Sequence, residues 1–226
     1  HDMEQPKYLE LLSQAWDIIV SVGGDGTLLE IGQKILHSKS ILGIIPIGSG
    51  NGLASHMGYI PRDIEAAFAA INNGTLFVFA AGNNGAMHAN LVGGLPYRIA
   101  ELNESWLVVV SVDPNNVETY YTNRCGVAAA FCVTAPGGGD SQSTKGIYAA
   151  DNDGGYIRLS GTSMAAPHVT GLAAALMSKF PSLTNKQIAT RIKTTSSLEN
   201  LTSSSGRTLA SHGEAYMQSV FGHGLV

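Results

Sequence analysis

Trp106-Leu107-Val108-Val109-Val110-Ser111-Val112 decides the fold, because this run is almost entirely apolar and does not alternate with polar residues. A strand of this kind is buried on both faces, as in a parallel sheet covered by helices. Similar runs lie at 17–22, 41–47, 76–81 and 131–135, and helical apolar spacing lies at 5–15, 27–36, 62–72, 164–180 and 183–194. The alternation predicts one continuous α/β domain over residues 1–226, with three α/β/α layers and one mostly parallel, flavodoxin-like or Rossmann-like sheet.

The composition excludes several classes of function. The chain has 226 residues, of which 44% are hydrophobic and 13% charged, so it can bury a large core. Its net charge of −4 and thinly spread Lys and Arg give no basic surface for nucleic acid. No apolar run is long enough to span a membrane. We therefore expect no nucleic acid, no membrane and no specific partner, with self-association left open.

The chain begins with His1-Asp2-Met3, which has neither the basic region nor the apolar stretch of a signal peptide. We interpret residues 1–3 as a tag remnant and expect recombinant expression in the cytoplasm.

Cys125 and Cys132 lie seven positions apart, and this span can close into a disulfide across a turn or remain two buried thiols. Two cysteines are too few for a structural zinc site. The stretch Asp151-Asn152-Asp153-Gly154-Gly155 hints at calcium but lacks the later bidentate Glu, so we predict a hairpin turn there. The sequence therefore predicts no metal site.

Two glycine-rich turns follow the first two predicted strands, at 22–28 (VGGDGTL) and 45–54 (IPIGSGNGLA). Glycines after a strand let the backbone approach a phosphate, and the N–H groups of the next helix favour its negative charge. Together the two motifs make residues 4–74 resemble the nucleotide lobe of diacylglycerol, sphingosine and bacterial lipid kinases. The resemblance implies a nucleotide site made of Gly23, Gly24, Asp25, Gly26, Thr27, Gly48, Ser49, Gly50 and Asn51, in which Asp25 orients the magnesium or the ribose.

The kinase family also needs a second, β-rich domain that closes over the nucleotide, and this sequence has none. Two interpretations stay open: the glycines only make tight turns, or the loops bind Mg-ATP weakly. Neither includes kinase activity, and neither requires a cofactor.

Three later motifs make residues 75–226 resemble subtilases, and more narrowly the passenger proteases of bacterial autotransporters. They lie at 79–85 (FAAGNNG), 135–137 (APG) and 161–169 (GTSMAAPHV). The resemblance implies a subtilase-like sheet, with Ser163 as the nucleophile at the start of a buried helix and Asn83 as a donor to the oxyanion. It also implies a secreted or cell-surface parent for this part, whereas the kinase parent is cytoplasmic.

A nucleophilic serine needs a histidine to take its proton and a carboxylate to orient that histidine. In subtilases the order is Asp, His, Ser, and the expected Asp-Ser/Thr-Gly and His-Gly-Thr-His settings are not found here. The histidines before Ser163 are His1, His37, His56 and His88, and none stands in that setting. Asp25-Gly26-Thr27 loosely imitates the aspartate motif, and His56 follows the next predicted strand. Triad groups must converge within hydrogen-bond reach, and two loops of another kind of active site give no reason to expect that. For His168, inside the serine motif, we predict a structural role.

Taken together, the two resemblances predict an engineered chimera that joins residues 4–74 to residues 75–226 and has no intact native activity. The alternatives are a subtilisin-like serine endopeptidase with Ser163 and Asn83 in its active site, and a weak ATP/Mg-binding module.

Overall fold

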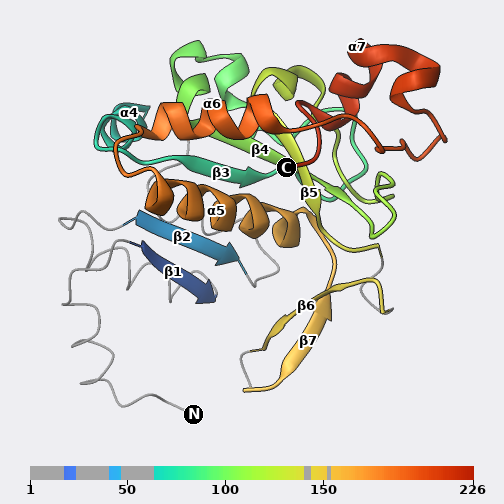
Figure 1. Ribbon diagram of the computed structural model, residues 1–226, viewed down its shortest axis with the longest axis horizontal. Coiled ribbons are helices and arrows are strands. Elements are labelled where there is room, and N and C mark those ends of the chain that lie inside the picture. Colours follow the sequence, from blue (N-terminus) through green and yellow to red (C-terminus); the bar gives the residue numbers. More distant parts are fainter. Residues whose placement is uncertain (1–17, 24–40, 47–63, 140–143, 152–153) are drawn as a thin grey trace.

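A computed structural model describes residues 18–23, 41–46, 64–139, 144–151 and 154–226 (Figure 1). Its strands form three hydrogen-bonded groups. β1 (Ile18–Gly23) and β2 (Ile41–Pro46) form a parallel pair. β3 (Phe77–Ala80), β4 (Trp106–Val112) and β5 (Cys132–Pro136) form a parallel sheet with β4 in the centre, and β6 (Ile147–Ala150) and β7 (Tyr156–Leu159) form an antiparallel hairpin.

Four α-helices and three short 3-10 segments accompany these strands in the described part of the chain. The helices are α4 (Ile64–Asn72), α5 (Thr162–Lys179), α6 (Asn185–Thr195) and α7 (Leu209–Phe221). The 3-10 segments are Leu95–Tyr97, Ala100–Ser105 and Gly126–Phe131. No helix among the described residues is long and apolar enough to cross a membrane.

Helices cover both faces of the three-stranded sheet, which confirms the predicted three-layer α/β class. All seven residues of β4 are buried, as a central parallel strand requires. Leu107 and Val109 pack on α5 and α6, whereas Trp106, Val108 and Val110 pack on the side of α4 and α7. Small buried residues of α5 (Ala165, Ala166 and Ala173) allow that helix to lie close to the sheet.

The strands do not form the one continuous sheet that we expected. α5 contacts β2 as well as β3, β4 and β5, and Figure 1 shows it between the two parallel sheets. Its position separates β1 and β2 from β3, so the described parallel strands belong to two sheets. A local apolar pattern predicts a buried strand but does not specify its neighbour.

One glycine turn and one hairpin are clear in the described residues. Gly74 has a left-handed φ of +93° and ends α4, where a side chain would be disfavoured. β6 and β7 pair antiparallel as far as Ala150 and Tyr156, and the Asp151 N–H donates to Gly155 O at 2.9 Å, which confirms the predicted hairpin. Where the structure describes them, the predicted ends of the helices and strands lie within two residues of the observed ends; the helices predicted at 5–15 and 27–36 lie outside the described residues.

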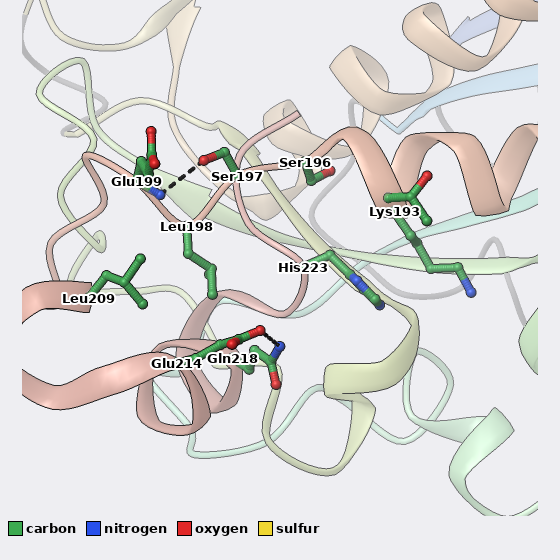
Figure 2. A pocket seen from close by; sticks show the side chains of 10 residues that line it. Lys193, Ser196, Ser197, Leu198, Glu199, Leu209, Glu214, Gln218 and His223 are labelled. Carbon is green, nitrogen blue, oxygen red and sulfur yellow. Dashed lines mark hydrogen bonds between the residues drawn. The ribbon is translucent and has the colours of Figure 1, made fainter.

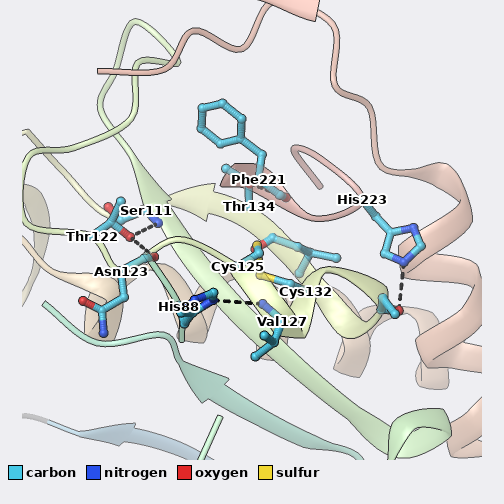
Figure 3. The surroundings of a disulfide bond; sticks show 12 residues. His88, Ser111, Thr122, Asn123, Cys125, Val127, Cys132, Thr134, Phe221 and His223 are labelled. Atoms are coloured by element: carbon cyan, nitrogen blue, oxygen red, sulfur yellow. Dashed lines mark hydrogen bonds between the residues drawn. A yellow bond between two sulfur atoms is a disulfide. The ribbon is translucent and has the colours of Figure 1, made fainter. Parts of the chain in front are cut away.

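The two cysteines form a disulfide, which answers the question that the sequence left open. The Cys125–Cys132 bond encloses the 3-10 segment Gly126–Phe131, and both cysteines are fully buried (Figure 3). Beside it, the backbone N–H of Val127 donates to His88 Nδ1 at 3.2 Å. The bond therefore fixes the connection into β5 at the point where β5 enters the core.

A nearly buried carboxylate connects two loops on the side of α7. Glu118 accepts from Arg124 Nε at 2.6 Å and from the backbone N–H of Ser204 at 2.8 Å, and its side chain is only 4% exposed. Burial alone would raise the pKa of Glu118, but the hydrogen bonds from Arg124 and Ser204 outweigh it and hold the pKa below its usual value. The ionised form is therefore the one that stabilises the fold.

Replacing both cysteines by alanine should lower the free energy of unfolding by about 2–3 kcal/mol, because the bond closes a short loop in the unfolded chain. The measurement is urea unfolding followed by circular dichroism. Dithiothreitol should shift the wild-type midpoint toward that of the double variant and leave the variant unchanged. Equal midpoints for the oxidised wild type and the variant would contradict the prediction.

Acid should destabilise the wild type through Glu118. Because its pKa is lowered in the folded state, its contribution is complete above the unfolded pKa and is lost as the pH falls through the folded pKa. Glu118→Gln should cost about 1–3 kcal/mol at pH 7, and progressively less as the pH falls through the lowered folded pKa of Glu118. Unfolding midpoints between pH 7 and pH 3 test this, with Glu104→Gln as the control, since the Glu104–Lys186 pair is exposed. A constant difference across this range would rule it out.

Candidate active site

The start of α5 places Ser163 at the positive end of a long helix. Gly161 is the N-cap, α5 runs for 18 residues from Thr162, and Ser163 is half-buried at the surface of the molecule. Helix N-termini favour developing negative charge. A negatively charged intermediate formed on Ser163 would therefore lie in a favourable field.

Asn83 reaches this helix start from the loop after β3. Its side-chain Oδ1 accepts from the backbone N–H of Thr162 at 2.9 Å and from Thr162 Oγ1 at 2.8 Å. A backbone N–H can only donate, so the acceptor must be the amide oxygen and the NH₂ group must occupy the other branch. The contact therefore orients Asn83 with its donor nitrogen away from Thr162.

Gly161 leaves room for the amide nitrogen. A Cβ added at Gly161 would lie 3.2 Å from Asn83 Nδ2. The backbone N–H of Gly161 donates to Gly137 O at 2.9 Å, which anchors the residue before the helix to the end of β5. The Ala-Pro-Gly and Gly-Thr-Ser motifs thus meet.

A buried hydroxyl supports the same loop. The phenol of Tyr121 donates to Gly138 O at 2.5 Å and contacts Ser111 Oγ at 2.8 Å. Burial raises the pKa of Tyr121, so the hydroxyl keeps its proton and remains a donor. It holds the residues that follow β5 against the start of α5.

An apolar cleft of about 220 Å³ lies beside Ser163, between the β6–β7 hairpin and the first turns of α5. Its lining residues are Ile147, Ala149, Ala150, Ile157, Leu159, Ser163, Met164, Pro167 and His168. His168 is the one histidine among these described residues, and its Nδ1 lies 2.8 Å from Met164 O. Nδ1 must donate to that carbonyl, which fits the structural role predicted for His168.

Most of the predicted nucleotide site cannot be placed. Gly23 ends β1 opposite Pro46 of β2. The other eight residues lie outside the described part of the chain: Gly24, Asp25, Gly26, Thr27, Gly48, Ser49, Gly50 and Asn51. His1, His37 and His56 also lie outside it. Nucleotide binding and substitute triad residues therefore stay predictions.

A second cleft, of about 430 Å³, lies between the end of α6 and α7 (Figure 2). Several of its polar groups already have partners within the protein. Gln218 donates to Glu214 at 2.8 Å, and His223 Nε2 contacts Ala130 O at 3.0 Å. Ser196 donates to Ile192 O at 2.7 Å. These contacts leave little chemistry directed at a ligand, so we place the candidate site at Ser163.

Two residues of the site escaped the sequence analysis. Thr162 orients Asn83, and its place between Gly161 and Ser163 in the serine motif was the available signal. Asn123 makes several hydrogen bonds to the loop that carries Asn83. Nothing in its local sequence distinguishes it from a surface asparagine.

Comparisons with known proteins agree with this geometry. The model of the subtilase family matches residues 26–224. An extracellular serine protease of Serratia marcescens is 38% identical over 143 residues, which are 56% of this chain and 14% of that protein. A thermostable alkaline protease of Halalkalibacterium halodurans is 30% identical over 201 residues, covering 87% of this chain and 48% of that protein. The chain thus spans less than half the length of these relatives.

A solved protease of Pseudoalteromonas arctica is similar in structure, with a TM-score of 0.54 and 29% sequence identity. The match covers 72% of this chain and 43% of that one. A cold-adapted subtilisin-like proteinase, with a TM-score of 0.55 and 24% identity, shares the fold over 83% of this chain.

These matches correct the prediction of an engineered chimera without native activity. The family model crosses the junction expected at residue 74 without a break, so it includes most of the segment that we assigned to a lipid kinase. The packing agrees, because Ala67 and Ile71 of α4 are buried in the same core as Trp106. Asn185 Nδ2 also donates to Ile71 O at 3.0 Å and Thr75 O at 2.8 Å.

The glycine motifs gave a wrong resemblance to lipid kinases because they are short and local. A tight glycine turn after a buried strand is needed in parallel α/β proteins of many families. The match over residues 26–224, in contrast, depends on nearly the whole chain. The chain therefore belongs to the subtilase family.

Proposed function

We propose that this chain acts as a subtilisin-like serine endopeptidase, with Ser163 as the nucleophile and Asn83 as the donor to the oxyanion. The observation that carries the proposal is the pair of hydrogen bonds by which Thr162 orients the Asn83 amide at the start of α5. The family and the curated relatives that are named serine proteases support it.

The reaction follows from the positions of these groups. Ser163 Oγ attacks the carbonyl carbon of a peptide bond, and the carbonyl oxygen gains negative charge. The Asn83 NH₂ group and the N-terminus of α5 stabilise that charge. The intermediate then expels the amine, which takes a proton, and leaves an ester on Ser163 that water hydrolyses.

The attack needs a base for the Ser163 proton. In subtilases this histidine and its carboxylate precede the asparagine in the chain. Asp25, in Asp25-Gly26-Thr27, loosely imitates the family's aspartate motif, and His56 is the next histidine before Asn83 that follows a predicted strand. We propose them as the base and its orienting carboxylate, and the first experiment below tests both.

We also propose that the protein acts outside the cytoplasm. The Cys125–Cys132 disulfide favours an oxidising compartment. Two of the relatives are named as extracellular and as an autotransporter lipoprotein, which supports the same place of action.

A fluorophosphonate probe should label Ser163 stoichiometrically, because only an activated serine reacts at a useful rate. Intact-protein mass spectrometry and cleavage of casein at pH 7–8 are the measurements. Ser163→Ala should abolish both, whereas Ser160→Ala removes a neighbouring buried hydroxyl and should leave labelling intact.

His56→Ala and Asp25→Asn identify the proton acceptor in the same assay. Loss of labelling in both would support the assignment, with His212→Ala on α7 as the histidine control, because His212 does not line the cleft beside Ser163. If His56→Ala labels as fast as the wild type, the base lies elsewhere; if the wild type is unlabelled, the proposed function is wrong.

Asn83→Ala should lower kcat by about 10²- to 10³-fold with little change in KM, because the lost donor acts on charge that develops in the transition state. Initial rates on a chromogenic peptide substrate measure both constants. Asn84→Ala is the neighbouring control, since the side chain of Asn84 makes no hydrogen bond among the described residues. An equal fall in both variants would contradict the role of Asn83.

A further inference from the structure

The loop that carries Asn83 is held by one buried asparagine. Asn123 Nδ2 donates to Ala81 O at 3.0 Å, and Asn123 Oδ1 accepts from the backbone N–H groups of Asn84 and Ala86, each at 3.0 Å. These contacts lie on both sides of Asn83 in the chain. The residue is only 3% exposed, so water cannot readily replace them.

The backbone of Asn123 adds to this attachment. Its N–H donates to Gly82 O at 2.8 Å. Gly82 has a left-handed φ of +108°, and a Cβ built on it would collide with Asn123 Nδ2. Glycine at position 82 therefore serves both the turn and the close approach of the asparagine.

Gly82 connects Asn123 to the start of α5. The Gly82 N–H donates to Thr162 Oγ1 at 3.2 Å, and that hydroxyl donates to Asn83 Oδ1. Asn83 is thus held twice: Asn123 fixes its backbone neighbours, and Thr162 fixes its side-chain amide.

We propose that Asn123 is a positioning residue for the oxyanion site, acting through Asn83 without contact with the substrate. The inference depends on the proposed function of Asn83. Only an amide fits the site, because it donates to a carbonyl and accepts from two N–H groups at once. An aspartate could accept but would place a negative oxygen beside Ala81 O.

A double-mutant cycle on Asn123 and Asn83 tests the proposal. The readout is the rate constant for fluorophosphonate labelling of Ser163, normalised to folded protein by circular dichroism. We expect Asn123→Ala to slow labelling by roughly tenfold or more in the wild type, and by less than about twofold in the Asn83→Ala background, because the effect requires Asn83. Independent, additive losses would overturn the proposal.

Asn185→Ala is the matched control for stability. Asn185 is a buried asparagine, 8% exposed, and its Nδ2 donates to Ile71 O, Thr75 O and Ser105 Oγ, far along the sheet from Ser163. It should destabilise the fold without slowing labelling of the folded protein. If Asn123→Ala slows labelling no more than this control, the role of Asn123 is only structural and the proposal is wrong.

Hydrogen exchange of the Asn84 and Ala86 amides separates this proposal from the proposed function. Both amides should be protected in the wild type and in Asn185→Ala, and should exchange at least tenfold faster in Asn123→Ala. Unprotected amides in the wild type would overturn the positioning role, whatever the activity. Protected amides in a wild type that does not react with the probe would support the attachment of the loop and refute the proposed function.

Discussion

The candidate site depends on one contact, in which Thr162 donates twice to the amide oxygen of Asn83 across 79 positions of sequence. This contact joins the carboxyl end of β3 to the N-terminus of α5. It requires α5 to lie close to the sheet, and the buried Ala165 and Ala166 make that possible. Core packing thus determines where Thr162 and the Asn83 amide meet, and larger side chains on that face would separate them.

Secondary-structure elements that depend on nearby residues could be predicted from the sequence. The apolar run of β4 predicted a buried parallel strand, and the motif around Ser163 predicted the start of a helix. The pairing of strands could not be predicted, because it depends on α5 lying between β2 and β3. Asn123 could not be found either, since its side-chain partners lie about 40 positions away.

The mistaken chimera has the same physical origin. A glycine turn specifies only the backbone conformation after a strand, and unrelated families have the same conformation there. Long-range contacts carry more information: Asn185 binds carbonyls at the end of α4 and before β3, across the proposed junction. A boundary at residue 74 would separate α4 from β3, although both pack in one core and Asn185 binds carbonyls on both sides of that boundary.

In the proposed mechanism, the described residues of the site contribute charge stabilisation. Asn83, Thr162, Gly82 and Asn123 form one connected set in which each buried polar group has a partner. Such a set needs little reorganisation when an oxyanion forms, and in serine proteases this contribution persists even when triad members are removed. The oxyanion half and the proton-transfer half are therefore separable in energy as well as in sequence. The residues that would stabilise the oxyanion follow β3 in the chain. Their geometry therefore does not depend on which histidine accepts the proton of Ser163.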